Sequence, residues 1–281
     1  MGHSPVFEGM ILLGRHMETK IQLFSWLFLG LTILCCWSTS AQGAVQAMDG
    51  RTLAQQVYDR DDGKDSYAKT EMILVDKGNK ERSRVMLLAR KMYGDLAKVY
   101  IRFNAPPDIE GTAFLGWENR EGPDDQYLYL PSLRRVRRIV SSQKDRSFVN
   151  SDYTYEDLEK RKVGKDNHTL LRSESLGKHE CWVLESVPKE TSESQYGKLV
   201  SWIAKDIYVP VQTEFYDSRD TLSKRYTAQD IKKIDGIWTV TESEMHNLKD
   251  GTRTIIKILS VRYNTGIPDR VFTTGYLEHA K

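Results

Sequence analysis

The stretch Ala97-Lys-Val-Tyr-Ile-Arg-Phe103 has the clearest periodicity in this sequence of 281 residues. Its apolar side chains occupy every second position: Ala97, Val99, Ile101 and Phe103. The positions between them hold Lys98, Tyr100 and Arg102. Because successive side chains of a β-strand point to opposite faces of a sheet, this pattern predicts a half-buried strand.

Similar segments lie on both sides of this strand. Before and after it we expect strands at 72–75, 84–90, 112–117, 126–130, 168–175, 179–187, 198–203, 207–216, 223–233, 237–245 and 252–263. Turn sequences such as Gly78-Asn79, Gly177-Lys178 and Asp235-Gly236 separate them, and a short amphipathic helix over 53–58 precedes them. The spacing predicts a mainly β protein with one antiparallel sheet, ordered largely as a meander.

Several of these strands are apolar on both faces. Val85, Leu87 and Ala89 alternate with Met86 and Leu88. A sheet with one face in water does not need apolar residues on both sides. We therefore expect helices to cover one face and a cavity to lie on the other.

The N-terminal part has the layout of a secretory signal peptide. Residues 21–37 are the only long apolar run, Arg15 and Lys20 precede it, and small residues follow. We expect cleavage between Ala41 and Met48, which leaves residues 48–281 as one domain. Met17 is the better start, so residues 1–16 are expected not to be translated. The alternative is an uncleaved membrane anchor, because about 17 apolar residues is near the lower limit for a span.

Composition narrows the functional classes. The 41 Lys and Arg residues nearly balance the 39 Asp and Glu residues, which gives no reason to expect a nucleic-acid partner. After loss of the leader only Cys181 remains, so the core alone must hold the fold, and we expect a monomer.

Motifs for catalysis or metal binding are absent from the sequence. It has no nucleophile elbow, phosphate-binding loop, HExxH or CxxC, and its histidines are scattered. Residues 59–65 resemble a calcium loop, but Gly63 and Thr70 stand where ligands are needed, so we expect a solvated turn. Cys181 is expected to be a small core residue. We therefore predict no enzyme activity, no cofactor and no metal.

The densest charge feature is the basic cluster formed by Arg134, Arg135, Arg137 and Arg138. We expect these arginines to pair with the acids that follow, among them Asp152, Glu156 and Asp157. The alternative is a docking surface for an acidic protein partner or a lipid headgroup.

Two segments resemble the signature of a known family: Tyr127-Leu-Tyr-Leu-Pro-Ser-Leu-Arg-Arg-Val-Arg-Arg-Ile139 and Ser147-Phe-Val-Asn-Ser-Asp-Tyr-Thr-Tyr-Glu-Asp-Leu158. They are similar to the outer-membrane lipoprotein-sorting proteins related to LolA and LolB, in their larger uncharacterised branch. Residues 107–115 fit the same branch. The sequence departs where Val149-Asn150 replaces Met-Gly. Since Asn tolerates left-handed backbone, we expect the turn to survive.

The resemblance implies an incomplete β-barrel, a strongly curved antiparallel sheet around a hydrophobic cavity with a few covering helices. Candidates to line the cavity are Leu87, Val99, Ile101 and Phe103, with plain core packing as the alternative. The motif residues expected to contact a partner or headgroup are Tyr127, Tyr129, Pro131, Arg134, Arg135, Arg137, Arg138, Asp152, Tyr155, Glu156 and Asp157.

The implied function is carriage. The protein is expected to bind acyl chains of a lipid or lipoprotein in the periplasm and pass them towards the outer membrane, with an inner-membrane lipid exporter as a possible partner. Burial stabilises an acyl chain by about 0.8 kcal/mol per methylene, so no catalytic group is required. The alternatives are a non-catalytic accessory subunit with a filled barrel, or an enzyme that modifies envelope lipids or glycans.

Overall fold

The computed structural model describes residues 48–190 and 194–279. The expected signal peptide, residues 1–47, lies outside the described residues. The strands are β1 (Asp65–Val75), β2 (Glu81–Tyr93), β3 (Leu96–Ala105), β4 (Ala113–Trp117), β5 (Asp125–Leu130), β6 (Arg135–Ile139), β7 (Asp166–Leu176), β8 (His179–Pro188), β9 (Lys198–Ala204), β10 (Pro210–Tyr216), β11 (Leu222–Ile234), β12 (Ile237–Asn247) and β13 (Thr252–Tyr263). The α-helices are α1 (Gly50–Tyr58) and α2 (Thr274–His279).

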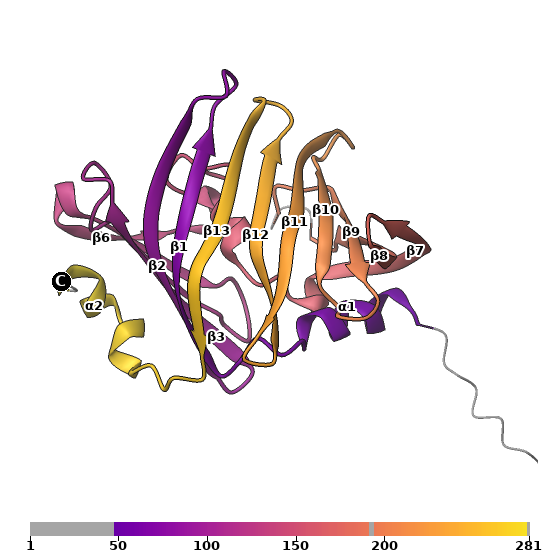
Figure 1. The fold of residues 1–281 in the computed structure, drawn as a ribbon, viewed down its shortest axis with the longest axis horizontal. Coiled ribbons are helices and arrows are strands. Elements are labelled where there is room, and N and C mark those ends of the chain that lie inside the picture. The colour runs from indigo at the N-terminus through magenta and orange to yellow at the C-terminus, as the bar shows by residue number, and fades with distance from the viewer. Residues whose placement is uncertain (1–47, 191–193, 280–281) are drawn as a thin grey trace, which may run out of the picture. The chain divides into compact units, whose positions relative to one another are not determined.

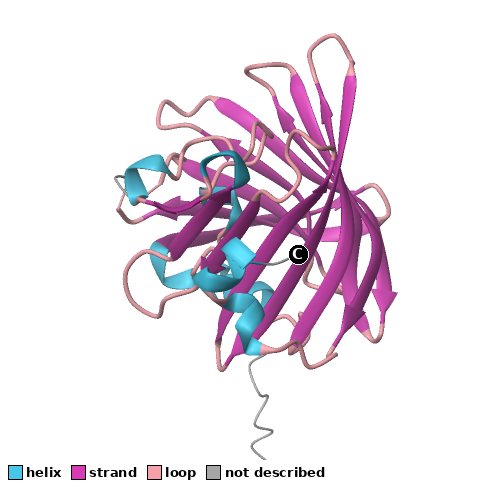
Figure 2. Cartoon of the chain, turned by 90° about the vertical axis from the view of Figure 1, so that its left-hand side faces the viewer, coloured by secondary structure: helices cyan, strands magenta, loops and turns pink. Residues whose placement is uncertain are grey.

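All these strands form one 13-stranded antiparallel sheet in the order β6-β5-β4-β3-β2-β1-β13-β12-β11-β10-β9-β8-β7. Each half is a meander, as predicted, and the two halves meet where β1 pairs with β13 (Figure 1). The sheet is strongly curved, and β6 and β7 are its free edges, so it does not close into a barrel (Figure 2). The prediction of a curved, incomplete barrel is confirmed.

Residues 140–165, which connect β6 to β7, cover the inner face of the sheet, and we call them the covering segment. Phe148 and Tyr155 of this segment pack against Phe103 of β3 and Phe114 of β4. The ring centroids of Phe103 and Phe148 are 6.0 Å apart, and those of Phe114 and Phe148 are 5.5 Å apart. The β1–β6 half of the inner face is therefore filled by aromatic side chains.

A tight turn holds the covering segment in this position. Val149 and Asn150 both have left-handed backbone, with φ of 48° and 60°. Arg84 Nη1 of β2 donates to the Val149 carbonyl at 2.5 Å. The prediction that the turn survives without the family's glycine is confirmed, although β-branched Val149 adopts a conformation that costs it steric strain.

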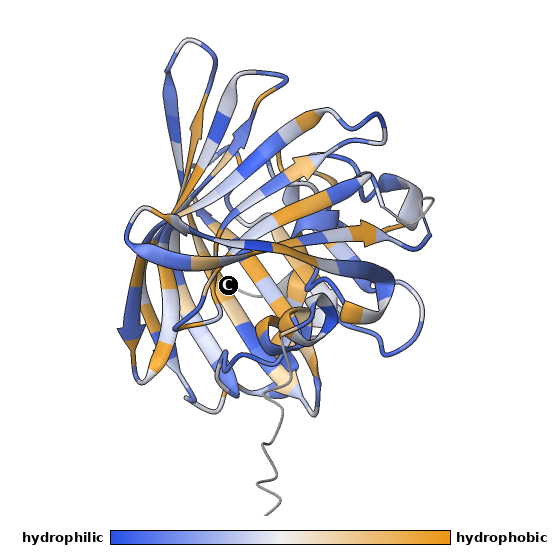
Figure 3. Ribbon diagram, turned by 90° about the vertical axis from the view of Figure 1, so that its right-hand side faces the viewer, coloured by the Kyte–Doolittle hydropathy of each residue, from blue (hydrophilic) through white to orange (hydrophobic). Residues whose placement is uncertain are grey.

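The C-terminal segment covers the outer face of the same half. Phe272, from the 3₁₀ turn η6 (Asp269–Phe272), and Leu277 of α2 are buried against Ala89, Tyr100 and Leu115. The strands of this half are apolar on both sides because both sides are covered, as the sequence predicted. The inner side is filled by the aromatic side chains of the covering segment, however, and among the described residues it holds no cavity of the kind we expected there. Hydrophobic and hydrophilic residues alternate along the strands elsewhere in the sheet (Figure 3).

Helix α1 covers the inner face at the opposite end of the sheet. Asp49 caps the helix by accepting from the Thr52 amide at 2.7 Å. Its buried stripe of Leu53 and Ala54 packs against Leu184 of β8 and Ile203 of β9. In the described part of the chain, no helix has the length and apolar character needed to cross a membrane.

Candidate functional site

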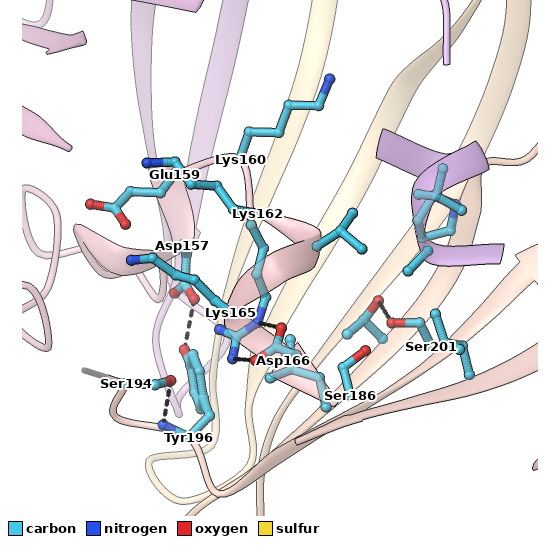
Figure 4. Close-up of a pocket in the computed structure, with 18 of the residues that line it drawn as sticks. Asp157, Glu159, Lys160, Lys162, Lys165, Asp166, Ser186, Ser194, Tyr196 and Ser201 are labelled. Atoms are coloured by element: carbon cyan, nitrogen blue, oxygen red, sulfur yellow. Dashed lines mark hydrogen bonds and ion pairs between the residues drawn. The ribbon is translucent and has the colours of Figure 1, made fainter. Parts of the chain in front are cut away.

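A cavity of about 720 Å³ lies on the inner face of the sheet, between strands β8–β12 and the covering segment (Figure 4). Its size is in the range of about 300–1,000 Å³ that is typical of pockets for small ligands. It occupies the half of the sheet that the aromatic side chains of the covering segment do not fill.

The floor of the cavity is apolar. It carries inward side chains of β8, β9, β10 and β12, among them Leu184, Leu199, Ile203, Phe215 and Met245. These side chains face the cavity because side chains alternate along a strand. Val183, Val200 and Trp202 occupy the alternate positions of β8 and β9 and belong to a core on the opposite face of the sheet. The floor therefore presents one apolar face of these strands to the cavity, while their other face packs in that second core.

Hydroxyl groups interrupt this apolar floor. Ser201 Oγ and Thr213 Oγ1 hydrogen-bond to each other at 3.0 Å, and Ser186 Oγ lies 2.9 Å from His168 Nδ1. Burial raises the pKa of Tyr153 and of Tyr226, so both phenols stay protonated at neutral pH. The floor is thus neutral, and its small polar groups are already satisfied.

The Ser186–His168 pair is the arrangement closest to a catalytic dyad. His168 Nε2 lies 3.0 Å from the Val163 carbonyl, which only accepts, so in the neutral imidazole Nε2 would carry the proton and Nδ1 would accept from Ser186. In the sheet, Ser186 pairs with His168 of β7 and with Leu199 of β9. The backbone amides next to Ser186 are therefore engaged in hydrogen bonds between strands. An acyl-transfer site needs amide donors aimed at an oxyanion, whereas the strand amides beside Ser186 in the described part of the chain lie within these strand pairings.

Ion pairs form the wall opposite the floor. Arg161 donates to both carboxylate oxygens of Asp166, at 2.5 and 2.7 Å, and lies 3.3 Å from Glu156. Although burial works against the charged form, these two carboxylates raise the pKa of Arg161. The Asp166 side chain is fully buried, so this pair fixes the end of the covering segment to β7.

A second buried network fixes the middle of the covering segment. Asp157 Oδ2 accepts from Lys224 Nζ of β11 at 3.0 Å. Asp157 Oδ1 accepts from the Tyr196 hydroxyl at 2.7 Å (Figure 4). Burial, together with the charge of Asp157, raises the pKa of Tyr196 well above its ordinary value. The three side chains join the covering segment to the sheet beside the cavity.

Two further pairs complete this wall. Glu159 binds Lys144 and accepts from Gln126 Nε2 at 3.1 Å, and burial raises the pKa of Glu159. Lys162 Nζ lies 2.8 Å from Asp124 Oδ1. The wall is therefore rich in charges, but these charges are balanced within it.

The residues predicted to line a cavity lie in the filled half of the sheet. Val99, Ile101 and Phe103 are on the inner face, in the cluster beneath Phe148. Leu87 pairs with Arg102 and faces the other side. None of the four is among the residues lining the 720 Å³ cavity. Ligand binding by these residues stays a prediction.

The acidic motif residues hold the covering segment in place. Asp152 accepts from Thr254 Oγ1 of β13 at 2.6 Å, and Tyr155 packs in the aromatic cluster. Glu156 accepts from the Ser194 hydroxyl at 2.5 Å. Glu156 and Asp157 also line the cavity. The acidic residues of the motif thus hold successive parts of the covering segment in place.

The arginine cluster has a different environment. The expectation that these arginines pair with Asp152, Glu156 and Asp157 is wrong, because Thr254, Arg161 and Lys224 already engage those acids. Arg138 instead binds Asp125, since the β5–β6 register places the two diagonally across neighbouring strands. Arg134, Arg135 and Arg137 are exposed.

The other motif residues shape the β5–β6 hairpin. Tyr127 and Tyr129 pack on the outer face near α2, and the Tyr127 and Trp117 rings lie 5.2 Å apart. Pro131 begins the turn η1 (Pro131–Leu133), which ends at Arg134 in left-handed conformation. These residues form the hairpin from which the arginines project.

Residues 59–65, which resemble a calcium loop, form a turn, and its carboxylates bind other groups of the protein. Asp62 binds Arg60 at 2.5 Å, and Asp65 accepts from the amides of Thr265 and Gly266. In the described ranges no group of three or more His, Cys, Asp or Glu side chains is placed to hold a metal ion. Cys181 is completely buried in strand β8, as expected of a core residue.

Comparisons with known proteins agree with this architecture. A family model described as an uncharacterized protein matches residues 95–279. A DUF1329 family protein from Desulfovibrio piger is 33% identical, over 81% of this chain and 97% of its own, with a TM-score of 0.78. A putative outer membrane lipoprotein-sorting protein domain from Vibrio parahaemolyticus is 35% identical, over 82% and 98%, with a TM-score of 0.77.

A LolA superfamily protein from Nitrosomonas europaea shares the fold, with a TM-score of 0.65 at 19% identity over 82% of this chain and all of its own. No curated protein sequence matched. The open sheet and these matches define a protein with a LolA-like fold. The chain belongs to the DUF1329 family, so the predicted family relationship is confirmed.

Proposed function

We propose that this protein is a non-catalytic periplasmic carrier that binds an acyl chain of a lipid or lipoprotein in the 720 Å³ cavity and passes it towards the outer membrane. The observation that carries the proposal is the apolar floor formed by Leu184, Leu199, Ile203, Phe215 and Met245 within a LolA-like sheet. Each buried methylene of a chain stabilises the complex by about 0.8 kcal/mol.

The location in the periplasm rests on the leader sequence of residues 1–47 and on the relative described as a lipoprotein-sorting protein. An inner-membrane lipid exporter is the proposed donor of the ligand. N-terminal sequencing of the exported protein tests the location. The mature chain should begin between Ala41 and Met48, and a chain that retains residues 21–37 would contradict export with cleavage.

Binding of a fluorescent fatty acid tests the cavity itself. Leu199→Asn places a polar group on the floor, where its desolvation opposes an incoming chain by about 1–3 kcal/mol, so affinity should fall about tenfold or more. Val99→Asn makes a similar change on the inner face of the filled half and should leave affinity nearly unchanged. Thermal unfolding of both variants separates lost binding from lost folding.

The same experiment distinguishes the alternatives. Weaker binding in Val99→Asn rather than in Leu199→Asn would place the ligand beneath β3, where the sequence predicted it. The aromatic filling of that half favours a second candidate, an accessory subunit of an envelope lipid exporter that carries no ligand. Wild-type protein that binds no lipid probe would support this candidate and overturn the carrier.

A further inference from the structure

The edge strand β6 carries a concentration of unpaired positive charge. Arg134, Arg135 and Arg137 are exposed, and within the described ranges none of the three has a side-chain ion pair. Arg138 binds Asp125 but is still 62% exposed. Side chains alternate along a strand, so Arg135 and Arg137 project from one face of the sheet edge and Arg138 from the other, rather than into one pocket.

Two aliphatic side chains flank this charge. Leu133, in the turn before β6, is 59% exposed, and Val140, just after the strand, is 49% exposed. They are two of the few large apolar residues that the described surface exposes to this degree. We call Leu133, Arg134, Arg135, Arg137, Arg138 and Val140 the β6 edge.

We propose that the β6 edge docks the protein on the surface of a membrane that contains anionic phospholipids. Guanidinium groups form paired hydrogen bonds with phosphate oxygens, and several basic residues together bind a negatively charged bilayer surface. A flat surface can contact guanidinium groups on both sides of a sheet edge at once. The two aliphatic side chains then reach the boundary between headgroups and acyl chains.

A membrane accounts for the β6 edge better than an added protein strand does. Charged side chains on a short edge strand oppose pairing with another strand, and β6 has only residues 135–139. The edge is also connected to the cavity wall, because Asp125, which binds Arg138, follows the cavity-lining Asp124. Docking would therefore bring the cavity wall near the bilayer. The proposal does not depend on which ligand the cavity binds.

Vesicle sedimentation tests the proposal without any cavity ligand. The purified protein should bind vesicles of 70% phosphatidylcholine and 30% phosphatidylglycerol more tightly than vesicles of phosphatidylcholine alone, and high salt should weaken the difference. Each arginine contributes about fivefold, so Arg134→Gln/Arg135→Gln/Arg137→Gln should weaken binding roughly a hundredfold. Leu133→Ser should weaken it about tenfold.

The control removes the same charge elsewhere. Lys77 and Lys80 in the turn between β1 and β2, and Arg82 at the start of β2, are exposed, and their triple Gln variant should bind nearly as wild type does. Equal losses in both triple variants would mean that only net charge matters, and the proposal would fail. It also fails if wild type does not prefer anionic vesicles, or if the β6 variant binds normally.

A protein partner gives a different result. Retention on immobilised polyglutamate that depends on the three arginines, without vesicle binding, would overturn the membrane proposal in favour of an acidic protein. A further outcome is that wild type does not bind vesicles while the Arg134→Gln/Arg135→Gln/Arg137→Gln variant self-associates. That result would show that the arginines only prevent the sheet edge from pairing with another chain. Because these side chains are exposed, the variants should keep the wild-type melting curve, which confirms that they fold.

Discussion

Asp157→Ala should destabilise the protein strongly, because it leaves the ammonium of Lys224 buried without its partner. The Asp157 side chain is 4% exposed and that of Lys224 is 10% exposed, with 3.0 Å between Oδ2 and Nζ. Removing one member of a buried pair costs about 3–5 kcal/mol. In a domain of this size each kcal/mol corresponds to about 2–4 °C, so we expect Tm to fall by about 6–20 °C.

An exposed pair of similar length is the control for this measurement. Asp95 binds Arg120 at 2.7 Å, but the two side chains are 60% and 70% exposed. Asp95→Ala should therefore cost less than about 1 kcal/mol. Thermal unfolding followed by circular dichroism measures both variants under the same conditions.

A double variant tests the physical reason. In Asp157→Ala/Lys224→Met the unpaired buried charge is gone, so the double variant should be more stable than Asp157→Ala alone. If Asp157→Ala costs no more than Asp95→Ala, the pair does not anchor the covering segment. If the two substitutions simply add, the buried charge is not the cause of the loss.

Three further predictions follow from single side chains. Arg138→Ala should change the free energy of unfolding by less than about 1 kcal/mol in denaturant titration, because its ion pair with Asp125 is largely exposed. The hydrogen bond from Lys249, helped by the Thr221 amide, holds the pKa of Asp217 at about 2. Since this pKa is lowered, its contribution to stability is present above about pH 4 and lost as pH falls towards 2. NMR titration should show that midpoint, and Lys249→Met should raise it. Burial raises the pKa of the Cys181 thiol, so a thiol reagent should label Cys181 in denaturant and not in the folded protein.

Twelve of the strands were predictable because the alternation of their side chains is a local signal. Strand β6 (135–139) was not predicted as a strand, because its run of arginines was interpreted only as a basic cluster. Residues 97–103 form strand β3, as predicted. The apolar residues on both faces of the neighbouring strands correctly indicated that other segments cover the sheet on both sides. Alternation does not say what lies opposite an inward residue. Val99 and Leu199 both face inwards, but Phe148 covers the region of Val99 while Leu199 borders a cavity.

A signal for the cavity was nevertheless present. Ser186, Ser201 and Thr213 occupy inward positions of three successive strands, where a tightly packed core would favour larger apolar side chains. The pairing of the arginines was not predictable in this way. It depends on the β5–β6 register, which brings Arg138 to Asp125, and on which basic residues reach Asp152, Glu156 and Asp157 across the fold.

The pairing of β1 with β13 has a consequence for how the chain folds. Met72 lies opposite Ile256, so the middle of the sheet joins residues roughly 180 positions apart. Within each half, neighbouring strands are joined by short turns and can pair as soon as they emerge. The central ladder must wait for the last strand and for closure of a very long loop, which is slow compared with local pairing. Until then β1 and β12 are unprotected edges, so the nascent protein is most prone to aggregation at the position that becomes the centre of the finished sheet.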